Sequence, residues 1–393
     1  MKHKFLFILL FSLVLEGMVT TQAVAGDYVH QVNTLIGTKG TGLTSGYLYP
    51  GATYPYGMVQ FTPSYFSKRS GFVINQLSGG GCEHMGNFPT FPVKGKLKMS
   101  PDNILNYRIN VSEEKGHAGY YEAMVQEDIK AKLTVTERTG MASYEYPADQ
   151  QYGTIIIGGG ISATPIEQAA IVITAPNKCE GYAEGGNFCG LRTPYKVYFV
   201  AEFDTDALES GTWKRDELKP NTTFAEGEYS GVYFTFDVNK KKNIQYKIGV
   251  SYVSVENARE NLKAENTGWD FLQIQNQAES KWNHYLGKIE VEGTNPDRTT
   301  QFYTHLYRSF IHPNVCSDVN GEYMGADFRV HKSRSKHYTS FSNWDTYRTQ
   351  IQLLSILDPE VASDIVISHQ LFAEEAGGCL LYTSPSPRDM RRS

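Results

Sequence analysis

Apolar and polar residues alternate along much of the chain between about residues 28 and 262. The clearest stretches are residues 132–146, 195–204, 231–238 and 244–252. In the second stretch one face is apolar and carries Tyr195, Val197, Phe199, Ala201 and Phe203. In the third stretch the apolar face carries Val232, Phe234 and Phe236. Because successive side chains of a strand point to opposite faces, this pattern predicts half-buried strands. Turn-rich segments separate the stretches and no long helical pattern interrupts them, so we expect a large antiparallel β-sandwich.

After residue 262 the apolar spacing changes to that of helices. Residues 266–289 predict a helix with Leu272 and Trp282 on its apolar side. A second helix is predicted from the four-residue spacing of the large apolar side chains Phe302, Leu306 and Phe310.

A third helix is predicted to begin at Asp358, which would be its N-cap, with Pro359 at the first helical position. We therefore expect a sandwich domain at residues 26–262, a helical linker at 263–296 and the start of a helical domain at 297–378.

Composition indicates the broad class of the protein. The chain has 393 residues, enough for two domains, and its 40% apolar and 20% charged content suits a protein with a large core. A net charge of −5 gives no indication of a nucleic-acid partner. The 26 Tyr, 20 Phe and 4 Trp are typical of β-rich proteins and of proteins that stack sugar rings, although core packing alone could account for them.

The N-terminus has the three-part pattern of a secretory signal. Lys2 and Lys4 precede an apolar run that ends at Leu15, and a polar segment leads to Ala23-Val24-Ala25. This pattern predicts cleavage after Ala25 and export to the periplasm or outside the cell. The run is too short to span a bilayer. No second long apolar run follows, so no membrane contact is expected after the signal is removed.

The cysteines allow one local disulfide. Cys179 and Cys189 flank a glycine-rich segment, and an exported protein could bridge them, although spacing alone gives the bridged and the free pair equal weight. No pair of cysteines has the CxxC spacing of a zinc site, so a thiolate metal centre is not expected.

Several collinear segments carry a family resemblance. They are residues 32–42, 49–63, 77–82, 136–147, 188–190 and 250–265, and most strongly 302–325 and 338–360. In this order they resemble glycoside hydrolase family 92, and the resemblance covers nearly all of residues 30–378.

The resemblance implies an exported, calcium-dependent, exo-acting and inverting α-mannosidase that acts on mannose-containing glycans. It implies an N-terminal β-sandwich joined to a C-terminal (α/α)6 toroid, with the active site at their junction. Inversion requires one carboxyl group as general acid and another as general base. In the family these groups and most calcium ligands lie downstream of the WDTYR motif, so we expect them beyond Gly378 and assign no catalytic or metal residue here.

The last residues depart from the family. After Gly378 the family continues with Trp-Leu-Pro, whereas residues 379–389 read like a translated sequencing-adapter oligonucleotide. We therefore interpret residues 379–393 as an artefact, with a natural Pro/Ser-rich tail as the alternative. On that interpretation the sequence is a truncated fragment, and the 393-residue chain should be inactive.

The strongest candidate for substrate contact is the segment SNWDTYR, residues 342–348. At a helix start, Trp344 could offer a stacking face and Asp345 could accept hydrogen bonds from sugar hydroxyls, with Arg348 orienting that carboxylate. The alternative is structural, because an acidic first turn favours the helix dipole and an Asp/Arg pair contributes only about 0.2–0.5 kcal/mol.

The second candidate is the segment LSGGGCEHMGNF, residues 77–88, with Cys82, Glu83 and His84 as a polar cluster. The alternative is a tight turn with a buried cysteine. Ile74 and Gln76 stand where many family members have histidines, and Asn87 replaces a frequent Asp. These departures leave the linkage preference and the outer subsite open.

Other signals favour structural roles. GTKGTG, residues 37–42, lacks the ending and context of a phosphate loop. His305 and His312 are expected to pack or cap rather than bind a ligand. Two further functions compete with the mannosidase: a non-catalytic glycan-binding sandwich module, and another sandwich-plus-toroid enzyme such as a lyase or phosphorylase.

Overall fold

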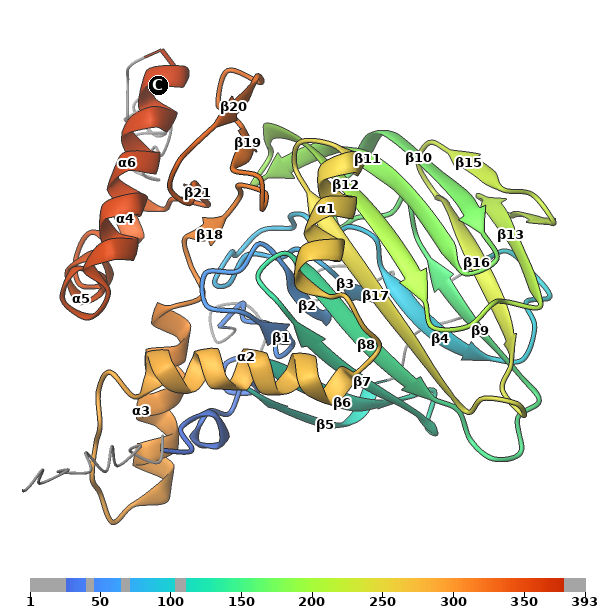
Figure 1. The fold of residues 1–393 in the computed structure, drawn as a ribbon, viewed down its shortest axis with the longest axis horizontal. Helices are drawn as coiled ribbons and strands as arrows, with labels where there is room; N and C mark the ends of the chain where they lie inside the picture. Colours follow the sequence, from blue (N-terminus) through green and yellow to red (C-terminus); the bar gives the residue numbers. More distant parts are fainter. Residues whose placement is uncertain (1–25, 40–45, 65–70, 103–110, 378–393) are drawn as a thin grey trace, which may run out of the picture.

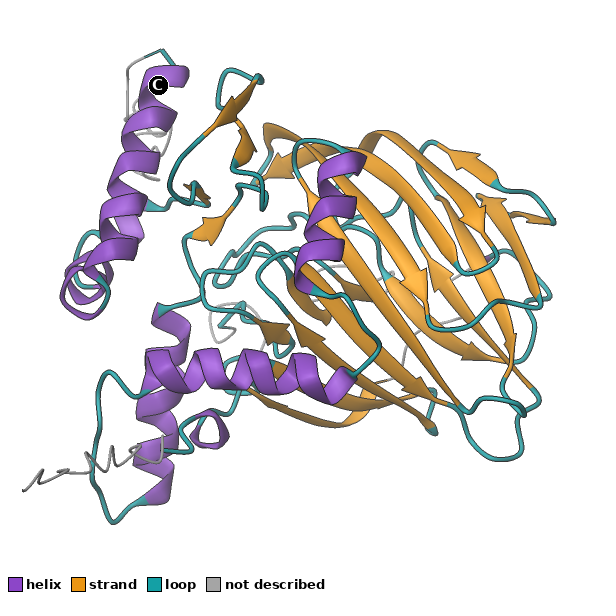
Figure 2. Cartoon of the chain, in the orientation of Figure 1, coloured by secondary structure: helices purple, strands orange, loops and turns teal. Residues whose placement is uncertain are grey.

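The computed structural model describes residues 26–39, 46–64, 71–102 and 111–377. It consists of a large β-sandwich followed by helices and short hairpins (Figures 1 and 2). The predicted signal segment, residues 1–25, and residues 379–393 lie outside the described part of the chain. In that part no helix has the length and apolar character needed to cross a membrane.

Two antiparallel sheets form the sandwich, as predicted. One has eight strands in the order β1-β2-β3-β4-β9-β16-β13-β14, and the other has nine in the order β15-β10-β11-β12-β17-β8-β7-β6-β5. The strands of the first are β1 (Ala52–Thr53), β2 (Gln60–Pro63), β3 (Phe72–Val73), β4 (Thr90–Lys94), β9 (Tyr152–Ile157), β16 (Ser230–Asp237), β13 (Glu209–Lys214) and β14 (Glu217–Pro220). Those of the second are β15 (Phe224–Glu226), β10 (Ile166–Ala175), β11 (Lys178–Phe188), β12 (Leu191–Phe203), β17 (Asn243–Ser251), β8 (Thr139–Glu145), β7 (Ile129–Val135), β6 (Tyr120–Val125) and β5 (Val111–His117).

The predicted apolar faces form the core between the sheets. Phe199 and Phe203 of β12 and Phe234 and Phe236 of β16 are buried there. The rings of Phe203 and Phe234 lie 4.9 Å apart between centroids, so the two sheets interlock through aromatic side chains. The alternating stretch at residues 132–146 divides into β7 and β8, which pair as a hairpin.

Six helices follow or flank the sandwich. They are α1 (Val255–Glu265), α2 (Phe271–Leu286), α3 (Pro296–Ser309), α4 (Asn343–Thr346), α5 (Gln350–Leu357) and α6 (Pro359–Glu375), with a short 3-10 helix η1 (Val29–Gln31) near the start. Between α3 and α4 lie the two-stranded pairs β18 (Asn314–Val315) with β21 (Tyr338–Thr339), and β19 (Glu322–Met324) with β20 (Val330–Lys332). As predicted, Asp358 is the N-cap of α6 and proline opens that helix.

Helix α1 begins inside the region that the alternation assigned to strands. Its buried residues are Asn257, Ala258, Asn261 and Leu262, so half of its buried positions are polar and no apolar stripe marks the helix. Its N-cap is Ser254, whose side chain accepts a hydrogen bond from the Asn257 amide. Helix α1 lies against β12 and β17, where it packs on Val200.

The apolar side of α2 differs from the prediction. Trp282 is fully buried, but Leu272 is 60% exposed. Leu272 and Trp282 are ten residues apart. At 100° per residue their side chains therefore point in directions about 80° apart around the helix axis, so the two do not share a narrow face. The buried stripe is Ile274, Ala278, Trp282, Tyr285 and Leu286.

Two close contacts fix α2 on the sandwich. The Trp282 indole Nε1 donates a hydrogen bond to the Thr53 carbonyl at 2.7 Å. Gly119, in the turn between β5 and β6, has a φ of +87°, and a Cβ there would lie 3.0 Å from the Ala278 Cβ. Only glycine meets both requirements without strain, so the helix approaches the hairpin closely.

A second core lies between the helices and the N-terminal segment. Val29, Tyr49 and Tyr56 from the N-terminal segment pack there with buried side chains of α2, α3, α5 and α6. Leu306 and Phe310 are buried in this core and Phe302 packs against it, which confirms the spacing predicted for the second helix.

The Cys179–Cys189 bridge, which the sequence left open, is not formed. Cys82 pairs with Cys189, and Cys179 is a buried free thiol. Cys179 lies near the start of β11 and Cys189 just beyond its end. Ten residues of extended strand separate the two by about 33 Å, far beyond disulfide reach.

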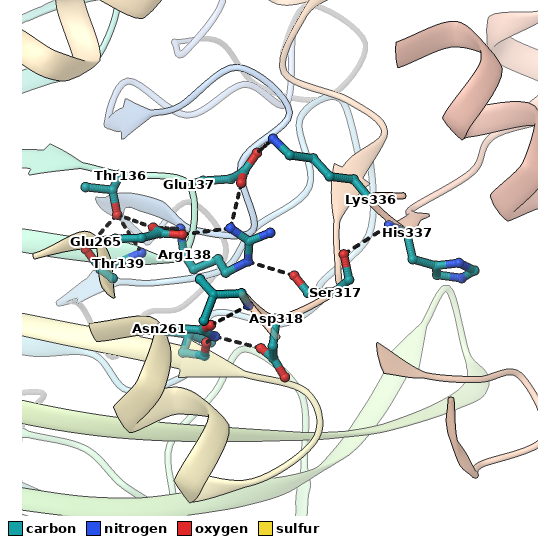
Figure 3. Close-up of polar contacts among 12 residues, drawn as sticks. Thr136, Glu137, Arg138, Thr139, Asn261, Glu265, Ser317, Asp318, Lys336 and His337 are labelled. Carbon is teal, nitrogen blue, oxygen red and sulfur yellow. Dashed lines mark hydrogen bonds and ion pairs between the residues drawn. The ribbon is translucent and has the colours of Figure 1, made fainter. Parts of the chain in front are cut away.

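A buried charge cluster joins the two halves of the molecule (Figure 3). Arg138, in the turn between β7 and β8, is 6% exposed and its Nη1 contacts Glu137 at 2.6 Å and Glu265 at 2.7 Å. Its Nε donates to the Ser317 carbonyl at 2.7 Å. Lys336 forms a further ion pair with Glu137. One guanidinium therefore contacts the sandwich, the end of α1 and the segment after β18.

Asp318, next to Ser317, is held by neutral donors. Its carboxylate accepts hydrogen bonds from Ser251 at 2.7 Å, from Asn257 at 2.8 Å and from Asn261 at 2.6 Å. Burial raises the pKa of Asp318 above its ordinary value. The three hydrogen bonds lower the pKa but only partly offset the effect of burial. Asn257 and Asn261, whose polarity breaks the apolar stripe of α1, thus bind the following domain to the sandwich.

Replacing Arg138 with alanine should lower the free energy of unfolding by about 3–5 kcal/mol, because the largely buried Glu265 loses its ion-pair partner and Glu137 keeps only Lys336. The matched control is Arg259→Ala, which removes a half-exposed arginine paired with Glu180 and should cost at most about 1 kcal/mol. Urea unfolding of both variants measures the difference. Equal losses would contradict the assigned role of Arg138.

Removing the disulfide in a Cys82→Ser, Cys189→Ser variant should cost about 2–5 kcal/mol, because the linked positions are 107 residues apart in the sequence. Cys179→Ala should keep the cross-link. Peptide mapping without reduction identifies the linked pair in each variant, and a Cys179–Cys189 peptide in the unmodified chain would contradict the structure.

Candidate functional site

The glycine-rich segment at residues 77–84 is closed by His84. The Leu77 amide donates to His84 Nε2 at 2.8 Å, and His84 Nδ1 lies 2.6 Å from the Cys82 carbonyl. One ring nitrogen must therefore accept and the other donate, which is the neutral imidazole. Burial lowers the pKa of His84, in keeping with that form.

The three predicted residues of this segment do not act as one polar cluster. Cys82 is in the disulfide, His84 is buried within the loop, and Glu83 is exposed. Glu83 is therefore the member whose side chain is most open to a ligand.

His312 joins this loop to the helical half. Its Nε2 accepts a hydrogen bond from the Ser78 amide at 2.9 Å, and its carbonyl accepts one from the Gln350 side chain at 3.0 Å. Burial lowers the pKa of His312 to about 4, so the ring stays neutral. His312 is thus a packed residue, as predicted, whereas His305 is exposed.

Helix α4 carries the WDTYR motif at the surface. Trp344 is 46% exposed and the neighbouring Asp345 is also exposed, while Ser342 is the N-cap and its hydroxyl donates to the Asp345 carboxylate. An exposed indole beside a carboxylate can stack on a sugar ring and accept hydrogen bonds from its hydroxyls.

The predicted pairing of Arg348 with Asp345 is not found. Arg348 Nε instead donates to the hydroxyl of Tyr347 at 2.8 Å. Helix α4 ends at Thr346, so Arg348 lies beyond it and the i,i+3 geometry that would join the two side chains is not maintained.

Sequence reasoning missed two cavities beside α2. The larger, of about 740 Å3, lies between Tyr54 and the polar side of α2 around Asn276 and His284. The smaller, of about 290 Å3, is lined by residues of the sandwich, α2, α6 and the segment leading into β21, including Tyr54, Glu137, Lys336 and Asp364. None of the six predicted site residues lines either cavity. The lining residues come from separate parts of the chain, and although several belong to segments that carry the family resemblance, among them Tyr54, Glu137 and Tyr338, sequence reasoning did not bring them together.

The smaller cavity combines ionised and neutral oxygen groups. Burial alone would raise the pKa of Glu137, but Arg138 and Lys336 hold it below its ordinary value. Burial raises the pKa of Asp364, and burial also raises the pKa of Tyr54 to about 12. The cavity therefore offers a carboxylate acceptor and phenol donors, which suit a hydroxyl-rich ligand.

Two clusters of metal-binding side chains occur in the described residues, and neither consists of oxygen ligands alone. Calcium prefers six to eight oxygen ligands. In the described ranges, the groups of three or more clustered metal-binding side chains are His30, His117 and Glu279, and Asp327, His331 and Glu375. Each group contains an imidazole, so neither is the oxygen-only cage expected for calcium.

Comparison with known proteins identifies both parts of the chain. Residues 31–251 match the glycosyl hydrolase family 92 N-terminal domain, and residues 257–385 match the glycosyl hydrolase family 92 catalytic domain. A protein of Arthroderma benhamiae described as an uncharacterized secreted glycosidase is 26% identical, with 86% of this chain and 48% of that protein covered.

Solved structures give the same result. A family 92 α-mannosidase from Bacteroides thetaiotaomicron, also solved in complex with mannoimidazole, is 26% identical with a TM-score of 0.80, covering 89% of this chain and 49% of that one. An inverting family 92 mannosidase from the same species has the same fold, with a TM-score of 0.77 at 24% identity and the same two coverages.

The chain spans about half the length of these relatives. Arg138 and His312 form contacts between its two matched regions, which together extend over most of the sequence. On this evidence the chain belongs to glycosyl hydrolase family 92.

Proposed function

We propose that the complete protein hydrolyses terminal α-mannosidic bonds of glycans, as an exo-acting, inverting, calcium-dependent enzyme exported to the periplasm or outside the cell. The observation that carries this proposal is the likeness over both domains to an α-mannosidase solved with mannoimidazole. The secreted description of the fungal relative and the signal-like N-terminus support export.

In this proposal the junction recognises the sugar. Trp344 provides the stacking face and Asp345 accepts hydrogen bonds from sugar hydroxyls, with its carboxylate oriented by Ser342 rather than by Arg348. Glu83 is the exposed acceptor on the glycine-rich loop, and the neutral rings of His84 and His312 hold that loop against the helical half.

The chemistry requires two carboxyl groups about 6.5–9.5 Å apart, one to protonate the leaving oxygen and one to activate water. By the family resemblance both lie beyond Gly378, as do most ligands of the calcium ion. When bound, calcium would supply a Lewis acid that orients the hydroxyls of the sugar. The residues described here contribute by binding and positioning the sugar.

The complete protein should release mannose from α-linked mannosides, with the β-anomer formed first, as inversion requires. Proton NMR during turnover distinguishes the anomers. The 393-residue chain is the comparison, and no turnover is expected from it because its general acid and base are assigned elsewhere. Turnover by this shorter chain would contradict that assignment. Glycan binding without hydrolysis by the complete protein would instead support the glycan-binding module.

Trp344→Ala in the complete protein should lower kcat/KM for mannosides by about 10–100-fold, equivalent to about 1.4–2.7 kcal/mol of lost stacking. Trp344→Phe should recover part of the loss. The matched control is Phe224→Ala, which removes a 54% exposed aromatic residue from β15, at the edge of the nine-stranded sheet. Equal effects of Trp344→Ala and Phe224→Ala would rule out a substrate contact at α4.

A further inference from the structure

Two imidazoles and a carboxylate converge at a place that the proposed function does not use. His30 lies in η1, His117 is the last residue of β5, and Glu279 lies in α2, three segments that meet in the lower part of Figure 1. We propose that these three side chains form a binding site for a divalent transition metal of the zinc class.

The geometry brings the ligand atoms close enough for one ion. One atom from each of the three side chains lies within 4.8 Å of the others. His117 Nε2 is 2.8 Å from the Glu279 carboxylate, and the centroids of the His30 and His117 rings are 4.6 Å apart. Tetrahedral zinc with bonds of about 2.0–2.1 Å needs ligand atoms about 3.3 Å apart. Small side-chain rotations would therefore replace the His117–Glu279 hydrogen bond with two metal bonds.

Groups that orient the ligands are already in place. Asp27 accepts a hydrogen bond from His30 Nδ1 at 2.6 Å, which leaves Nε2 of that ring for a metal. Gln275 donates to the Glu279 carboxylate at 2.7 Å. A carboxylate on the second nitrogen of a histidine is the usual outer support of zinc-binding imidazoles, because it fixes the tautomer and raises ligand basicity.

The donor set selects the type of metal. Imidazole nitrogens favour zinc, copper and nickel, whereas calcium and magnesium prefer oxygen ligands. The His117 and Glu279 side chains are 16% exposed, and the His30 side chain is 55% exposed. The ion could therefore reach the site from solvent and keep water as its fourth ligand.

The proposed ion would connect three distant parts of the chain. It would attach the N-terminal segment to the end of β5 and to α2, the helix that Trp282 fixes on the sandwich. Zinc should therefore stabilise the fold rather than take part in hydrolysis, because binding only the folded state raises its stability by mass action.

The test uses the full chain, purified without a polyhistidine tag, with zinc binding measured by isothermal titration and by elemental analysis after dialysis. The unmodified chain should bind a single zinc ion. His30→Ala, His117→Ala and Glu279→Gln should each weaken binding by about 100-fold or more, and Asp27→Asn by about 10–100-fold. His305→Ala removes an exposed histidine from α3 and should leave binding unchanged.

Thermal unfolding separates metal binding from loss of fold. Zinc should raise the Tm of the unmodified chain and of His305→Ala but not that of His30→Ala, whose exposed side chain can be removed with little effect on the metal-free Tm. Millimolar calcium should not displace the zinc. Absence of stoichiometric zinc, equal weakening in His305→Ala, or displacement by calcium would each overturn the proposal.

Discussion

The buried guanidinium of Arg138 is the contact on which the relation between the two domains depends. A cation in a nearly dry environment is stable only when carboxylates and carbonyls surround it. Here these partners come from the sandwich turn, from the end of α1 and from the segment after β18. Movement of any one of the three segments would cost the guanidinium an ion pair or a buried hydrogen bond. The sandwich and the following domain are therefore positioned as one unit.

The same reasoning explains the arrangement of the candidate site. The glycine-rich loop is held by the disulfide to Cys189 and by the neutral rings of His84 and His312. His312 also accepts from Gln350 at the start of α5, just after the WDTYR motif. Loop and motif are thus anchored to a common residue, although the described side chains of Trp344 and Glu83 remain exposed.

Much of the fold was readable in the sequence because strand alternation is a local signal. The aromatic faces of β12 and β16 follow from this alternation and the register of α3 from helix periodicity, while the cap of α6 follows from the residue pair Asp358-Pro359. Helix α1 could not be predicted from the sequence, because asparagines occupy part of its buried side, where they bind Asp318 of a distant segment. Leu272 was wrongly predicted to lie on the buried side of α2, because it was chosen for its apolar side chain and its angular position around the helix axis was not considered.

The candidate site was predicted only in part, for a similar reason. WDTYR and the glycine-rich loop are contiguous in sequence, so they could be named, but the partner of each side chain could not. The partner of Cys82 is set by the way the β11–β12 turn meets the loop, and the cavity that includes Glu137 is assembled from the sandwich, α2 and α6. Such contacts between distant segments leave no periodic pattern in the chain.

If the protein is exported, as proposed, the Cys82–Cys189 link also bears on the order of events during its synthesis and oxidation. Cys82 is made first and must wait until another 107 residues have followed before its partner is available. Cys179 reaches the same oxidising surroundings earlier and is a competitor for it. Formation of β11 buries Cys179 in the sandwich core, and burial raises the pKa of its thiol, which suppresses the reactive thiolate. In the folded nine-stranded sheet Cys179 is therefore a poor competitor of Cys189 for Cys82.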